Sequence, residues 1–217
     1  MTHSETITHV SPVWFYLTKQ SAVEYLFDGV QDVNHLFVKS IKSKNPRIKV
    51  VPRFYIRPDM DELKWFLNSR IYSLMTRKLV DLCQEYEFDG IIFDIPIFNN
   101  LKYSGNVKHF IELVVSEFER KSLLKYLVLS GSRFSLNKDE DSLRPFLESF
   151  DKVLISTYDY RRGWLSPKQW FLQNAQFWTR LLAKYSLPKH RIMLGIQFYG
   201  YLEKLDVMSR RQIQIEE

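Results

Sequence analysis

The stretch Phe88-Asp89-Gly90-Ile91-Ile92-Phe93-Asp94-Ile95-Pro96 decides how the rest of the chain is interpreted. Its apolar run is typical of a strand that is buried on both faces of a parallel sheet. The carboxylate of Asp94 lies near the end of this run. Burying a charged group in an apolar strand costs free energy, so we expect the carboxylate to be paired with another group or to have a functional role. Because side chains alternate along a strand, Ile92, Asp94 and Pro96 are predicted to share one face.

Similar apolar or β-branched runs recur along the chain, and helical patterns lie between most of them. The runs cover residues 7–17, 48–56, 90–97, 126–131, 152–158 and 191–199, and the helical patterns cover 30–44, 60–87, 107–124 and 166–185. Alternation of strands and helices indicates a parallel sheet, and this many units favours a (β/α) barrel over an open sheet. No glycine-rich phosphate loop follows any strand, which argues against a nucleotide-binding fold.

Length and composition limit the remaining choices. The chain has 217 residues, of which 45% are hydrophobic and 26% charged, so we expect one globular domain over residues 1–217. A complete eight-stranded barrel of this kind needs about 250 residues. The net charge of +6 comes from basic residues that are spread out, so no nucleic-acid partner is expected.

The sequence lacks the signals that are typical of several other classes of protein. No apolar run approaches the ~20 residues of a membrane span, and the first nine residues do not resemble a signal peptide. Cys83 is the single cysteine, so no internal disulfide is expected. The five histidines show no metal-ligand spacing, and we expect neither a metal nor a cofactor.

Three segments together resemble glycoside hydrolase family 18, the chitinases and chitinase-like proteins. Residues 89–96 are similar to the family's strand Asp-Gly-x-Asp-x-Asp-x-Glu, and residues 155–160 to its Met-x-Tyr-Asp strand. Residues 194–200 are similar to its Leu-Gly-x-Pro-x-Tyr-Gly strand. The resemblance implies a (β/α)8 TIM barrel.

A divergent branch of that family, the chitinase domain-containing proteins, is more similar still. Residues 7–14, 50–53 and 157–160 resemble its second, third and sixth strands. By this alignment the chain covers strands two to seven, so we expect a barrel that is incomplete at both ends.

The resemblance also implies that the catalytic acid is missing. Family 18 enzymes use substrate assistance, in which the terminal Glu of the signature protonates the leaving oxygen and the middle Asp orients the substrate acetamide. Here Asp94 takes the place of the Asp, and Pro96 takes the place of the Glu. We therefore expect no catalytic residue in the degenerate motif, which retains Asp89 and Gly90 and has Ile92 in place of an earlier acid.

A sugar-binding cleft can persist without that acid, because aromatic faces stack on sugar rings and a few polar groups fix orientation. The candidate ligand-binding residues are predicted to lie at or near the carboxyl ends of strands. They are Trp14, Arg53, Asp94, Tyr158, Asp159, Gln197 and Tyr199, with Asp159 as the candidate partner of Asp94.

The favoured interpretation is a chitinase-like protein that binds chito-oligosaccharides or related glycans without hydrolysing them. One alternative is a glycan-active enzyme of altered mechanism that uses Asp94 and Asp159. Another is a scaffold that engages a protein partner. Family resemblance implies a secreted or lysosomal protein, and fold alone does not choose among these functions.

Overall fold

The fold was analysed in a computed structural model, which describes residues 7–19, 25–56, 69–95, 104–131, 140–157, 167–196, 201–205 and 210–214. Its main feature is a seven-stranded sheet with the order β3-β2-β5-β6-β7-β8-β9. The strands are β1 His9–Val10, β2 Val13–Lys19, β3 Tyr25–Asp28, β4 Lys49–Val50, β5 Arg53–Ile56, β6 Gly90–Asp94, β7 Leu124–Ser130, β8 Lys152–Ser156, β9 Ile192–Leu194, β10 Tyr201–Leu205 and β11 Arg210–Gln214.

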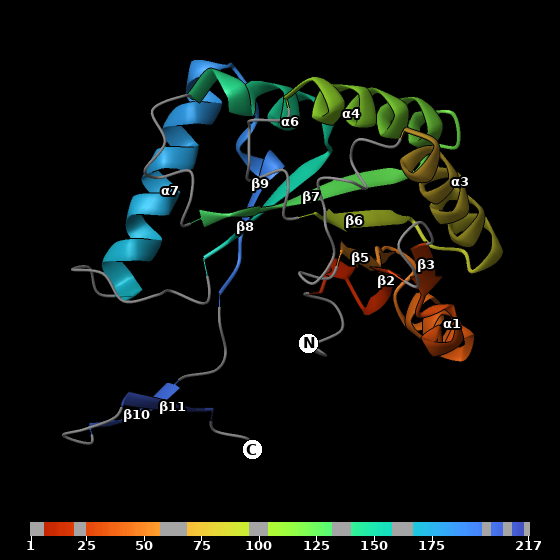
Figure 1. Cartoon of the computed structure of the whole chain (residues 1–217), viewed down its shortest axis with the longest axis horizontal. Coiled ribbons are helices and arrows are strands. Elements are labelled where there is room, and N and C mark those ends of the chain that lie inside the picture. The colour runs from red at the N-terminus through yellow and green to blue at the C-terminus, as the bar shows by residue number, and fades with distance from the viewer. Residues whose placement is uncertain are drawn as a thin grey trace.

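Helices connect these strands on one side of the sheet. They are α1 His35–Lys44, α3 Ser69–Glu85, α4 Ser104–Glu119, α6 Arg144–Ser149 and α7 Pro167–Lys184, with the short 3₁₀ turns η2 Val30–Asp32, η5 Glu140–Leu143 and η6 Lys189–Arg191. Figure 1 shows α1, α3, α4, α6 and α7 forming an arc around the strands. All strand pairs from β2 to β9 through β5, β6, β7 and β8 are parallel, so their carboxyl ends share one edge. The alternating architecture predicted from the sequence is confirmed, and the barrel is not closed within the described residues.

The sheet buries its two faces in different ways. On the helix side, Phe93 of β6 packs against Phe110 and Phe118 of α4, with ring centroids 5.9 and 5.4 Å apart. The opposite, inner face carries a smaller cluster made of strand and strand-adjacent residues alone, namely Val51, Ile92, Tyr126, Val128, Leu124, Leu154 and Met193. The alternation predicted for Ile92 and Asp94 is therefore confirmed, because Ile91 and Phe93 belong to the helix side.

Some elements were not predicted. Strand β3 pairs antiparallel with β2 at the edge of the sheet, and the chain leaves β3 through Gly29, which has a φ of 95°. A Cβ on Gly29 would lie 1.6 Å from the carbonyl oxygen of Trp14. The turn η5 with helix α6, and the separate two-stranded sheet of β10 and β11, were likewise missed.

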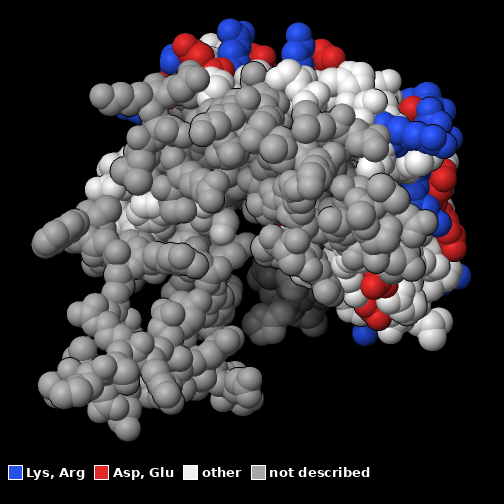
Figure 2. Space-filling model, viewed as in Figure 1, with Lys and Arg blue, Asp and Glu red and all other residues white. Residues whose placement is uncertain are grey.

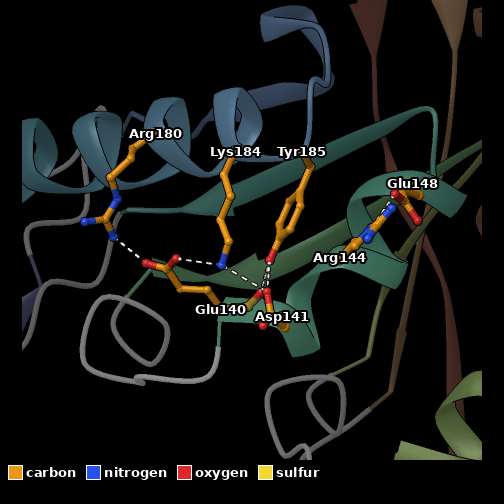
Figure 3. A network of polar contacts seen from close by, with 7 residues as sticks. All are labelled: Glu140, Asp141, Arg144, Glu148, Arg180, Lys184 and Tyr185. Atoms are coloured by element: carbon orange, nitrogen blue, oxygen red, sulfur yellow. Dashed lines mark hydrogen bonds and ion pairs between the residues drawn. The ribbon is translucent and has the colours of Figure 1, made fainter.

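A polar network joins the β7–β8 connection to helix α7 (Figure 3). Lys184 lies 2.9 Å from Asp141 and 3.3 Å from Glu140, and the Tyr185 hydroxyl donates to Asp141 over 2.8 Å. Arg180 pairs with Glu140 as well. Hydrogen bonds from Lys184 and Tyr185 hold the pKa of Asp141 below its usual value. Because the network is exposed, salt screens it, and it fixes geometry more than it adds stability.

Candidate functional site

The candidate site is centred on Asp94 and Arg53, two inward-facing residues of neighbouring strands. Arg53 is the first residue of β5 and pairs with Ile92 of β6, so both residues and Asp94 point to the inner face. The side chain of Arg53 extends along its strand toward the carboxyl edge. Its Nε donates to Asp94 Oδ2 over 2.9 Å, and its Nη2 also donates to Oδ2.

Asp94 is a buried acid with a charged neighbour. The residue is 9% exposed, and the Arg53 side chain is 28% exposed. Burial raises the pKa of Asp94 above its usual value, while the charge and hydrogen bonds of Arg53 act in the opposite direction. One carboxylate oxygen thus carries both guanidinium contacts, so Asp94 is held in place by its neighbour.

The beginning of the motif serves another purpose. Asp89 accepts hydrogen bonds from the Val50 amide and from Lys49 Nζ, at 2.9 and 3.0 Å, and forms an ion pair with Lys42 at 3.0 Å. Although burial alone would raise its pKa, the Val50 amide and the two lysines bring the pKa of Asp89 below its usual value. Asp89 therefore ties β4 and α1 to the start of β6, at the end of the strand away from Asp94.

Trp14 does not join this site. Its ring contacts Phe37 of α1 at 6.2 Å and Phe88 at 5.6 Å between centroids, which places it on the helix side. The register between β2 and β5 shifts between Val13 and Phe15, so Trp14 and the buried Phe15 both join the helix-side core. Trp14 was predicted at or near the carboxyl end of a strand, but it lies near the start of β2 and on the helix side, where this bulge breaks simple alternation. Its role in ligand binding stays a prediction.

The other predicted site residues lie outside the described residues: Pro96, Tyr158, Asp159, Gln197 and Tyr199. Their roles stay predictions. The strands that precede them in sequence, β6, β8 and β9, are parallel members of the sheet and end at the same edge. At that edge Thr157, which follows β8, donates from Oγ1 to the carbonyl oxygen of Gly195, which follows β9.

The sequence predicted both Asp94 and Arg53 as ligand-binding residues and named Asp159, which lies outside the described residues, as the candidate partner of Asp94. The structure shows Arg53 in contact with Asp94. The pairing of the two residues follows from the register between β5 and β6, which the structure gives. A long side chain that starts opposite Ile92 can reach one step further along the neighbouring strand.

Other surface features lie away from this pair. A polar groove of about 360 Å³ lies between α3 and α4 and is lined by Arg77, Val80, Asp81, Gln84, Glu117, Arg120 and Lys121. In Figure 2, basic side chains stand beside acidic ones along the described margin of the molecule. No group of three or more His, Cys, Asp or Glu side chains in the described part of the chain could hold a metal ion. Among the described helices, none is long and apolar enough to cross a membrane.

Solved chitinase domains have a similar backbone. The catalytic domain 2 of the Ostrinia furnacalis Group II chitinase matches with a TM-score of 0.68 and 16% identity, over 92% of this chain and 58% of that domain. A chitinase from Chromobacterium violaceum matches with a TM-score of 0.70 and 18% identity, over 92% of this chain and 63% of that one. YKL-39, solved in the presence of chitooligosaccharides, matches with a TM-score of 0.68 and 15% identity, over 91% of this chain and 62% of that one.

These matches establish the class of fold. The chain has the α/β architecture of chitinase barrels and spans about three fifths of the length of the proteins it resembles. No family profile matches the sequence.

Proposed function

We propose that this chain is a chitinase-like protein that binds chito-oligosaccharides or related glycans at the carboxyl edge of the sheet and does not hydrolyse them. The observation that carries the proposal is the inner face of β6. It presents Ile92 and then Asp94, and the next residue of the same parity in the sequence is Pro96. The site thus has one carboxylate on this strand, and that carboxylate is paired with Arg53.

This arrangement is poorly suited to glycoside hydrolysis. Cleavage needs a group that gives a proton to the leaving oxygen, and general acid catalysis contributes about 10²–10⁴-fold. Proline has no proton to give, and Asp94 is held by a guanidinium group on Oδ2. Arg53 and Asp94 instead form a fixed polar pair of the kind that orients a ligand in an otherwise apolar site.

The nature of the ligand is inferred from two supports. The YKL-39 structure was solved in the presence of chitooligosaccharides, and its fold is similar to that of this chain. The sequence also supplies Tyr158 and Tyr199 for stacking, with Asp159 and Gln197 as polar groups, directly after β8 and β9 in the chain.

Calorimetric titration of the 217-residue protein with chitotetraose tests this proposal. We expect binding to the wild type and a loss of at least about tenfold in Asp94→Asn and Arg53→Met, since each change removes a charged hydrogen-bond partner. Asp81→Asn, on the outer surface of α3, is the control and should bind like the wild type. Circular dichroism checks that each variant is folded. A folded wild type that binds neither chitotetraose nor any other glycan in a panel would refute the proposal.

A scaffold for a protein partner is the second candidate, and the same ion pair favours it. A carboxylate that is paired with a neighbouring strand's arginine can be a structural remnant. On that account Asp94→Asn and Arg53→Met leave partner binding intact and glycans do not bind. The titration therefore separates the two candidates.

We infer two finer points from the sequence resemblance alone. One is a relationship to the chitinase domain-containing branch of family 18. The other is a secreted or lysosomal location. Co-fractionation of the native protein with lysosomal or secreted markers tests the location, and recovery with cytosolic markers alone would contradict it.

A further inference from the structure

The inner face carries a second polar contact at the amino-terminal end of the sheet, away from Asp94. His9 of β1 and Tyr126 of β7 meet through a hydrogen bond of 2.8 Å between Nε2 and the phenol oxygen. At this end β1 pairs with β4, the Asp89 amide that precedes β6 donates to Val50, and β6 pairs with β7. Three strand spacings therefore separate the two residues along the sheet.

That separation shows how strongly the sheet is curled. Neighbouring strands lie about 4.8 Å apart, so three spacings on a flat sheet would hold the backbones of His9 and Tyr126 roughly 14 Å apart. A direct hydrogen bond between the side chains spans the hollow of the curved sheet. The contact therefore links β1 and β7, two strands that do not pair with each other.

The surroundings of His9 make the His9–Tyr126 hydrogen bond sensitive to the charge on the imidazole. Its Nδ1 lies 2.8 Å from Thr8 Oγ1, so both ring nitrogens are engaged. Tyr126 is 2% exposed and belongs to the apolar inner cluster. The charged groups that act on the imidazole from the surrounding elements are Lys49 of β4, Asp89 before β6 and Lys152 of β8.

We propose that the His9–Tyr126 contact is an acid-sensitive hydrogen bond. It stabilises the curvature of the sheet while His9 is neutral and weakens when His9 takes up a proton. A neutral imidazole satisfies Thr8 and Tyr126 in either tautomer, because both hydroxyl groups can reorient. An imidazolium in the same place adds a positive charge beside two lysines at the edge of an apolar cluster. The positive charge on His9 weakens the His9–Tyr126 contact more than any change in the number of hydrogen bonds does.

Electrostatics agree with the geometry. Burial lowers the pKa of His9 below its usual 6.5, and Lys152 and Lys49 lower it further, while Asp89 opposes them. With the folded pKa below the unfolded one, the unfolded chain takes up the proton first as pH falls. The stability due to this contact is present above about pH 6.5 and is lost as pH falls from there through the folded pKa.

Thermal unfolding between pH 7.5 and 5.0 tests the acid sensitivity. We expect the fall in the melting temperature over this range to be smaller in His9→Gln than in the wild type, by about 3–5 °C for each tenfold change in the folding equilibrium constant that is removed. The exposed His190→Gln is the matched control and should fall like the wild type. An equal fall in His9→Gln and the wild type would overturn the proposal.

Two further measurements keep the proposal testable if His9→Gln is unstable. Proton magnetic resonance of the histidine rings should give His9 a titration midpoint below 6.5, which Lys152→Met moves upward. Amide hydrogen exchange at pH 7.5 should be at least about threefold faster in residues 49–56 and 124–130 of Tyr126→Phe than in the wild type. A titration midpoint of His9 at or above 6.5, or unchanged amide hydrogen exchange in Tyr126→Phe, would contradict the proposal.

Discussion

At the scale of single residues, the guanidinium of Arg53 and the carboxylate of Asp94 form the centre of the candidate site. The carboxylate is buried, and Arg53 supplies its two hydrogen bonds on the inner face. Loss of either partner leaves the other in a site from which much of the water is excluded, which is costly for a charge.

Arg53→Met is predicted to lower the free energy of unfolding by about 1.5–3 kcal/mol, because it removes a charged hydrogen-bond donor from a buried acid. Arg120→Met, which removes the exposed pair with Glu117, is the control and should cost less than about 1 kcal/mol. Urea denaturation at pH 7 measures both changes. Equal, small losses in the two variants would show that the Arg53–Asp94 pair contributes no more than a surface contact.

Asp89 gives a residue-scale prediction for pH. Its folded pKa is lowered, so the stability it contributes is present above the unfolded value of about 3.9 and is lost as pH falls through the folded one. In Asp89→Asn, stability at pH 7 should be reduced, and the further loss below about pH 4 should be smaller than in the wild type. Denaturation curves at pH 7, 4 and 3 test this, and parallel curves for the two proteins would contradict it.

At the scale of elements, β6 depends on close contact with β7. A Cβ on Gly90 would lie 1.9 Å from the carbonyl oxygen of Leu124, so no side chain fits without moving one of these strands. The glycine of the motif is thus required by strand packing, whatever the chemistry at the other end of β6.

Gly90→Ala is predicted to destabilise the protein by about 3 kcal/mol or more, in the range of severe packing defects. Gly105→Ala is a matched control within helix α4, where nothing lies within 4 Å of the added Cβ. That change should be neutral or stabilise by up to about 1 kcal/mol, because alanine favours a helix. Melting temperatures compare the two variants, and a similar effect of both would refute the role given to Gly90.

The strands could be predicted from the sequence more completely than the candidate site. Apolar runs predicted six strand segments of the sheet, most clearly β6, which is buried on both faces, and alternation placed Asp94 correctly. Strand β3 has only four residues, and helix α6 has six, too few to show a period. Trp14 was misplaced because a bulge put it on the side of Phe15. The Arg53–Asp94 pair was missed because it depends on register between strands, which a single strand's sequence does not reveal.

At the scale of the whole molecule, the described part of the chain is a curved sheet with β3 at one edge and β9 at the other. Helices cover its outer side (Figure 1). The His9–Tyr126 hydrogen bond spans its inner side. The similar chitinase domains are longer, since this chain spans 58–63% of the three compared above. The carboxyl edge that bears Asp94 is where parallel barrels carry their functional groups, so binding at that edge is the central claim.

Equilibrium dialysis of the 217-residue protein against chitotetraose, with mass spectrometry of the recovered sugar, tests this claim most directly. We expect sugar to be enriched on the protein side and recovered as the intact tetramer after prolonged incubation, with the enrichment reduced in Asp94→Asn. Absence of enrichment with folded protein would contradict the binding claim. Shorter sugars that appear with the wild type and not with Asp94→Asn would contradict the claim that hydrolysis is lost.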